Sequence, residues 1–183
     1  MQKRKKRPVL VCHAFVAACA LGLAGCGGHS PETGTSDQPP AAAPKPAPEV
    51  LRMQLVSDDK TVALSDFRGK VLLVDFFASA SDSCRAEIAP LNALYAELSV
   101  RPFAMLGITL DLKPQVYVES DLHFSQPDFP CALGGRNARD AFPGAQALPT
   151  KWLLDRNGVV VKRYNGPVPI ADIRTDIEKC LAQ

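Results

Sequence analysis

The sequence predicts an α/β domain with a mixed central β-sheet and helices packed against it. Two observations support this prediction. Apolar runs of strand length alternate with segments of helical periodicity after residue 48, and the series ends with two strands joined by a tight turn. Alternation is typical of parallel strands with crossover helices, and a terminal hairpin adds antiparallel strands to the same sheet. Residues 49–183 have an ordinary length for one domain with a single core.

The first elements of this domain are a hairpin, a buried strand and a long helix. The hairpin is expected at 53–64 around a turn at 58–60. Val71–Phe77 is a continuous apolar run, typical of a strand buried on both faces, and only Asp75 interrupts it. Apolar side chains then recur at helical spacing after Cys84, at Ile88, Leu91, Leu94, Tyr95 and Leu98. A helix is therefore expected to begin at or near Cys84.

The later elements continue the alternation of strands and helices. In chain order we expect a strand at 103–110, a helical or partly helical stretch near 115–122, a short strand at 129–133, a helix-like segment at 136–142, strands at 151–155 and 159–164, and a closing helix at 170–181. The sequence Arg156-Asn157-Gly158 is a tight turn between the last two strands.

Cys84 stands out because it lies in the first turn of the predicted long helix. Unpaired backbone N–H groups and the helix macrodipole favour a thiolate at such a position. Asp75 stands out because a lone carboxylate in an apolar strand costs several kcal/mol unless it is hydrogen-bonded, neutral or used in chemistry. Both residues are therefore candidates for a functional site.

Two sequence blocks carry a family resemblance. LSDFRGKVLLVDFFASASDSCRAEIAPLNALY, residues 64–95, and LPTKWLLDRNGVVVKRYNG, residues 148–166, follow one another along the chain. The first is similar to LxGKVVLVNFWATWCPPCRAExPxLNxLY, the pattern of the TlpA-like branch of the thioredoxin superfamily, and the second resembles that family's cis-proline loop and hairpin. The resemblance implies a thioredoxin fold with an N-terminal β-hairpin and helices on both faces of the sheet. It also implies thiol–disulfide chemistry on protein or peptide partners, without a cofactor or metal.

The resemblance assigns roles to individual residues. Ser81 occupies the position of the family's first cysteine, and Cys84 that of the second, resolving cysteine. Asp75 matches the buried aspartate that helps to move the proton of the second cysteine, although it is equally expected as a neutral, hydrogen-bonded core acid. Leu148 and Pro149 match the loop that binds an extended peptide. Without the first cysteine, the two motif positions cannot form a disulfide with each other.

Three functions stay open on this evidence. The first is a thiol–disulfide oxidoreductase that works through Cys84 as a single thiol, or through Cys84 paired with Cys131. The second is a peroxidase of the peroxiredoxin type, because that branch keeps Thr/Ser-x-x-Cys, which Ser81 and Cys84 fit. The third is a non-catalytic module that binds a peptide or partner beside Cys84 and Pro149. Cys131 and Cys180 are otherwise expected to be small core residues.

The N-terminal segment predicts export and lipidation. Residues 3–7 are an unbroken basic run, 9–23 are largely apolar, and Leu23-Ala24-Gly25-Cys26 resembles a bacterial lipobox. We interpret residues 1–25 as a signal peptide and Cys26 as the lipid-modified first residue of the mature protein. An uncleaved anchor helix is the alternative, and both place the domain outside the cytoplasm, anchored to an envelope membrane and facing the periplasm.

Residues 26–48 are rich in Pro, Ala, Gly and Ser and predict a flexible tether for a monomeric domain at 49–183. Removal of residues 1–25 takes away five basic side chains and no acidic ones, so the formal net charge changes from +2 to −3. No basic patch remains. This composition excludes a nucleic-acid-binding function.

Overall fold

The computed structural model describes residues 51–57, 60–111, 126–145 and 147–183. The predicted signal peptide, Cys26 and the tether lie outside the described residues, as do part of the hairpin turn and the helical stretch expected near 115–122. In the described part of the chain, none of the helices has the length and apolar character that a membrane span needs.

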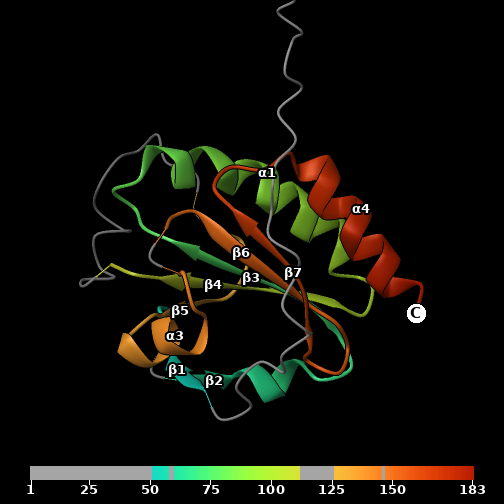
Figure 1. Cartoon of the computed structure of the whole chain (residues 1–183), viewed down its shortest axis with the longest axis horizontal. Helices are drawn as coiled ribbons and strands as arrows, with labels where there is room; N and C mark the ends of the chain where they lie inside the picture. The colour runs from blue at the N-terminus through green and yellow to red at the C-terminus, as the bar shows by residue number, and fades with distance from the viewer. Residues whose placement is uncertain (1–50, 58–59, 112–125, 146) are drawn as a thin grey trace, which may run out of the picture. The chain divides into compact units, whose positions relative to one another are not determined.

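A mixed five-stranded sheet organises the domain, in the order β5-β4-β3-β6-β7 (Figure 1). Its central strand β3 (Val71–Phe77) pairs in parallel with β4 (Phe103–Thr109) and antiparallel with β6 (Thr150–Leu154). The edges are β5 (Cys131–Leu133), parallel to β4, and β7 (Val160–Asn165), antiparallel to β6. Every residue of β3, β4 and β6 is buried, as the apolar run in β3 predicts.

Both faces of this sheet are covered, which confirms the thioredoxin-like α/β fold (Figure 1). One face carries α1 (Asp82–Leu98) and α4 (Ile170–Leu181). The other carries the hairpin of β1 (Arg52–Gln54) and β2 (Thr61–Ala63), the short 3-10 helix η1 (Leu64–Phe67) and α3 (Arg136–Ala141). Side chains alternate along a strand, so Leu73, Asp75 and Phe77 point toward α1 and α4.

Most element boundaries lie within two residues of the sequence prediction. The strand Val71–Phe77 and the helix Ile170–Leu181 are confirmed without a shift. Helix α1 begins at Asp82 rather than at Cys84, because Ser81 caps it. Strand β5 begins only at Cys131, directly after Pro130, which has no N–H to donate to a sheet ladder.

Candidate functional site

Ser81 is the N-cap of α1 and places Cys84 in the first helical turn. Its backbone is extended, and its hydroxyl oxygen accepts a bond of 3.4 Å from the Cys84 N–H. The same oxygen lies 3.0 Å from the hydroxyl oxygen of Ser83. Serine is a favoured N-cap residue because it satisfies one of the free N–H groups of the first turn. Ser81, which the sequence resemblance assigns to the position of the first cysteine, therefore has a structural role as the cap of α1.

The loop that precedes Ser81 is tied down on two sides. Ser79 N donates to a carboxylate oxygen of Asp111 over 2.9 Å, and the Thr109 hydroxyl donates to the same oxygen over 2.9 Å. From α1, Arg85 donates to the carbonyl oxygen of Ser79 over 2.8 Å. Asp111 thus joins the end of β4 to the loop that leads into Cys84. No motif in the sequence marked it, because only the fold brings residues 79 and 111 together.

Cys84 is a buried thiol, with 3% of its surface exposed. Burial raises the pKa of the Cys84 thiol, and a hydrogen bond from Ser81 lowers it by a smaller amount. A helix N-terminus alone is expected to lower the pKa of a thiol. Here the pKa is raised, because the cost of burying the thiolate outweighs the favourable effect of the helix dipole. Cys84 is therefore protonated at neutral pH.

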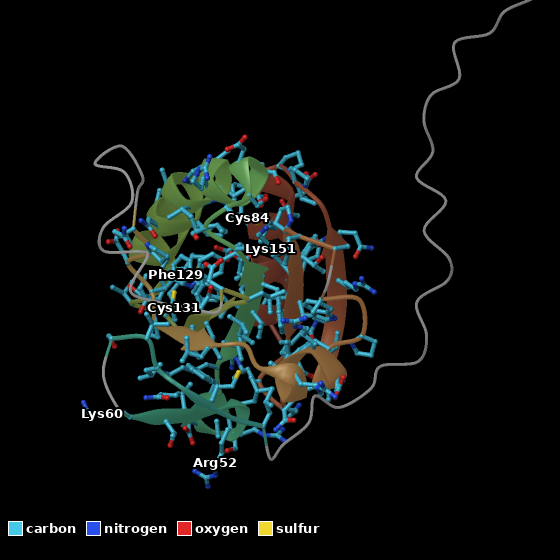
Figure 2. The ribbon with its side chains drawn as sticks, turned by 90° about the vertical axis from the view of Figure 1, so that its left-hand side faces the viewer. Arg52, Lys60, Cys84, Phe129, Cys131 and Lys151 are labelled. Carbon is cyan, nitrogen blue, oxygen red and sulfur yellow. The ribbon has the colours of Figure 1, made fainter. Side chains whose placement is uncertain are left out.

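A cluster of three buried charged side chains lies close to Cys84. Asp75 comes from β3, Glu87 from α1 and Lys151 from β6, where Asp75 and Lys151 are direct register partners. Lys151 Nζ donates to Glu87 Oε2 over 2.7 Å and lies 3.4 Å from Asp75 Oδ1. The charges of Asp75 and Lys151 both act on the ionisation of Cys84. Figure 2 labels Cys84 just above Lys151.

The two carboxylates of this cluster are bonded differently. Glu87 is engaged through both oxygens, because Oε2 accepts from Lys151 and Oε1 accepts from the Val168 N–H over 3.3 Å. Asp75 Oδ1 is buried and accepts no hydrogen bond with good geometry from any described residue, although Lys151 is within ion-pair distance. Of the two carboxylates, Asp75 thus has an oxygen whose lone pairs are available to accept a proton.

Burial raises the pKa of Asp75 from an ordinary value of 3.8 to about 6, because it outweighs the attraction of Lys151, and Glu87 adds to the rise. Burial lowers the pKa of Lys151, but the attraction of the two carboxylates is larger and the pKa is raised overall. Lys151 therefore stays charged at neutral pH. Asp75, with a pKa of about 6, changes its charge near neutral pH.

The loop Leu148-Pro149 lies at the same end of the sheet as the start of α1. The Leu148–Pro149 peptide bond is cis, as the resemblance implied. Thr150 pairs with Phe76 near the end of β3, so Pro149 lies level with the point at which the chain leaves β3 for α1. Leu148 packs against the apolar cluster that includes Cys84. The structure therefore brings the predicted peptide-binding residues and the candidate thiol to one end of the sheet.

All three cysteines in the described residues are free thiols. Cys180 is buried in the core, as expected, whereas Cys131 is only half-buried. Cys131 Sγ packs on Gly107, where a Cβ atom would lie 2.7 Å from the sulfur. Burial raises the pKa of Cys131 to about 12, and its sulfur donates to the carbonyl of Phe129, which Figure 2 draws beside it. The alternative disulfide between Cys84 and Cys131 is not formed in this structure.

Comparison with known proteins places the chain in a family. The Redoxin family model matches residues 42–178. Thiol-disulfide oxidoreductase ResA of Geobacillus thermodenitrificans is 27% identical over 115 residues, covering 63% of this chain and 66% of the relative. Hydroperoxy fatty acid reductase gpx1 of Synechocystis sp. is 31% identical over 156 residues, covering 68% of this chain and 90% of the relative.

The solved structures show the same fold. A putative thiol:disulfide interchange protein DsbE from Chlorobium tepidum superposes with a TM-score of 0.66 at 26% identity, covering 75% of this chain and 96% of that protein. The mixed five-stranded sheet with helices and an N-terminal hairpin agrees with that similarity. The chain is therefore a member of the Redoxin family with a thioredoxin-like fold.

Proposed function

We propose that the protein is a TlpA-like thiol–disulfide oxidoreductase that works through the single thiol of Cys84. Relatives named as thiol-disulfide oxidoreductases and a solved structure named as a thiol:disulfide interchange protein support this reaction class. The observation that carries the proposal is Asp75, a buried carboxyl with a pKa of about 6 whose charge acts on Cys84. A chain without thiol chemistry gains nothing from such a costly group, and perturbed carboxylates cluster at functional sites.

The proposed reaction begins with proton transfer from the Cys84 thiol to Asp75. The Cys84 thiolate then attacks one sulfur of a substrate disulfide, so that a Cys84–substrate disulfide forms and the other substrate sulfur leaves and takes up a proton. A first reductant thiol attacks the Cys84 sulfur of this mixed disulfide, so that the second substrate sulfur leaves as a thiol and a Cys84–reductant disulfide forms. A second reductant thiol then attacks the reductant sulfur of that bond and releases the Cys84 thiol. The substrate disulfide is reduced by two electrons in total, and the reductant thiols are oxidised to a disulfide.

An external thiol is needed for the second step because the hydroxyl of Ser81 cannot resolve a mixed disulfide. The raised pKa of Cys84 also has a consequence, since only the thiolate is nucleophilic. Exchange is expected to be slow at neutral pH and to accelerate as pH rises. The backbone at Leu148 and Pro149 is the proposed binding edge for an extended peptide, by resemblance to the family.

The proposed location is the periplasmic side of an envelope membrane, with a lipid on Cys26 and residues 26–48 as the tether. The lipobox-like sequence and the proline-rich composition support it. The test is the Cys26→Ser variant, which should release the protein from the membrane fraction and lose radiolabelled fatty acid. A variant that stays in the membrane fraction would favour the uncleaved anchor helix.

The reaction is tested with a glutathionylated peptide as substrate and dithiothreitol as reductant. Cys84→Ser should abolish protein-dependent release of the peptide thiol. Cys180→Ser is the matched control, because it also replaces a buried free thiol, and it should leave the rate unchanged. Urea unfolding of both variants shows that each is folded. Full activity in Cys84→Ser would rule out the proposed chemistry.

A peroxidase is the second candidate, because the relative named hydroperoxy fatty acid reductase is matched over 90% of its length. Peroxide would oxidise the Cys84 thiol to a sulfenic acid and be reduced to an alcohol. Consumption of an organic hydroperoxide with dithiothreitol as the reductant distinguishes this activity from disulfide exchange. The burial of Cys84 favours a third candidate, a non-catalytic binding module, which is the expected outcome if neither substrate is turned over.

A further inference from the structure

A single row of residues crosses the sheet beneath α1 and α4. Neighbouring strands pair these positions in register: Cys131, Gly107, Asp75, Lys151 and Tyr164. Register partners point to the same face of a sheet, so the row faces the helices. Gly107 contributes no side chain, which leaves Lys151 as the charged neighbour of Asp75 along the row.

Lys151 is an unusual residue for this place. It lies inside β6 with none of its surface exposed, in a strand whose other residues are also buried. A buried ammonium group is stable only when it is paired, and here one cation serves two carboxylates. The closer contact, 2.7 Å, goes to Glu87, while Asp75 is 3.4 Å away. The ammonium group of Lys151 therefore lies closer to the carboxylate of Glu87 than to that of Asp75.

We infer that Lys151 is a positioning residue that commits Glu87 to a fixed ion pair and leaves Asp75 as the proton acceptor for Cys84. The inference rests on the proposed function of Cys84. Lys151 has no exposed surface with which to touch a substrate, so it acts through its contacts with these two carboxylates and through the effect of its charge on Cys84. Its charge sets the pH at which Asp75 exchanges a proton.

Other titratable groups face this space from four elements, namely Cys84 and Glu87 of α1, Cys131 of β5, Tyr164 of β7, and Asp176 and Cys180 of α4. The Tyr164 hydroxyl donates to Asp176 over 3.0 Å, and its pKa is raised by burial and by that carboxylate. The pKa values of Cys131 and Cys180 are also raised by burial. Of these groups, Cys84 is the thiol on whose ionisation the charges of both Asp75 and Lys151 act.

Two substitutions are expected to move the titration of Asp75 in opposite directions. Lys151→Met removes the attraction that lowers the pKa of Asp75, so its midpoint should rise. Glu87→Gln removes a repulsive charge and frees the ammonium group for Asp75, so the midpoint should fall. The expected shifts are about one pH unit or more each way. A residue that only supports the fold would not give opposite shifts.

The midpoint is measured by carbon-detected NMR of the Asp75 carboxyl group, and the pH profile of Cys84 alkylation by iodoacetamide is followed by peptide mass spectrometry. The low-pH inflection of the alkylation profile should move with the Asp75 midpoint. Lys162→Met is the matched control, because Lys162 pairs with Asp176 at the surface of the neighbouring strand, and it should move neither. If Lys151→Met does not fold, the double variant with Glu87→Gln removes the cation and one acid together, and its midpoint should lie above that of the wild type.

Three results would overturn the inference: an unchanged Asp75 midpoint in Lys151→Met or in the double variant, a rise in Glu87→Gln, or an alkylation profile that does not follow Asp75. A different result would contradict the proposed function without contradicting this inference. If the Asp75 midpoints and the alkylation profiles shift as expected but Cys84→Ser retains disulfide exchange, the positioning role holds and the proposed catalytic thiol is wrong.

Discussion

Asp75→Asn removes from the core a carboxyl group whose pKa burial raises from 3.8 to about 6. The folded state therefore holds this proton more tightly than the unfolded chain, and the contribution of Asp75 to stability falls as pH rises through that interval. This rise in the pKa of Asp75, from 3.8 to about 6, corresponds to about 3 kcal/mol. Asparagine has no charge to bury, so the variant avoids this loss.

The assay is urea unfolding of wild type and variant from about pH 4 to about pH 7.5, followed by the fluorescence of Trp152, the only tryptophan. The difference in unfolding free energy should change by about 2.5 kcal/mol in favour of Asp75→Asn over that interval, because a small part of the effect is already present at about pH 4. Any constant offset from the altered contact with Lys151 cancels in this comparison. A difference that is independent of pH would show that the attraction of Lys151 balances burial, and one that favours the wild type as pH rises would show that it outweighs burial. Either result would remove the basis of the proton-acceptor role.

Three further outcomes are expected. Ser81→Cys places a second thiol at the cap of α1, so insulin reduction with a thiol donor should rise roughly tenfold or more, and an unchanged rate would show that the site differs from a dithiol site by more than one residue. Asp111→Ala removes the acceptor for the Ser79 N–H, so alkylation of Cys84 should accelerate severalfold while stability falls by about 1–2 kcal/mol, and a slower alkylation would contradict the anchoring role. A chain that begins at Glu49 should unfold within about 0.5 kcal/mol of the mature protein, because the proline-rich segment is expected to bury little surface, and a larger loss would show that it packs on the domain.

The fold was predictable because its strongest local signals agree with its tertiary environment. The apolar run of β3, which only Asp75 interrupts, reflects burial on both faces, and the periodicity of α4 reflects one buried stripe. Helix α1 begins two residues before Cys84, near which its start was expected, because Ser81 caps it. Serine before a helical pattern is itself a start signal, so the cap was readable from the sequence.

The candidate site was only partly predictable. Cys84, Asp75 and the cis proline were identified because they stand in family motifs or interrupt an apolar pattern. Lys151 and Glu87 were not, since they are 64 residues apart and only the antiparallel pairing of β3 with β6 brings Lys151 to Asp75. The sequence nevertheless contained a signal for this contact. A lysine inside one apolar strand and an aspartate inside another are expected to form an ion pair, because buried charges are usually paired.

Burial also changed the chemistry expected of Cys84. The sequence shows that the residue is near a helix N-terminus, which favours the thiolate. It does not show how much surface the neighbouring loop and core remove from water, and this cost dominates the pKa of the thiol. Reactivity at a helix start is therefore a question of packing as much as of position.

The most direct measurement is the location of the mixed disulfide formed with oxidised glutathione. The protein is incubated with excess oxidised glutathione at several pH values, free thiols are blocked with N-ethylmaleimide, and the modified peptides are identified by mass spectrometry. Glutathione is expected on Cys84, at a rate that increases with pH, while Cys180 stays unmodified. An adduct confined to Cys131, or no adduct on Cys84 under conditions that modify it in the unfolded chain, would contradict single-thiol chemistry at Cys84.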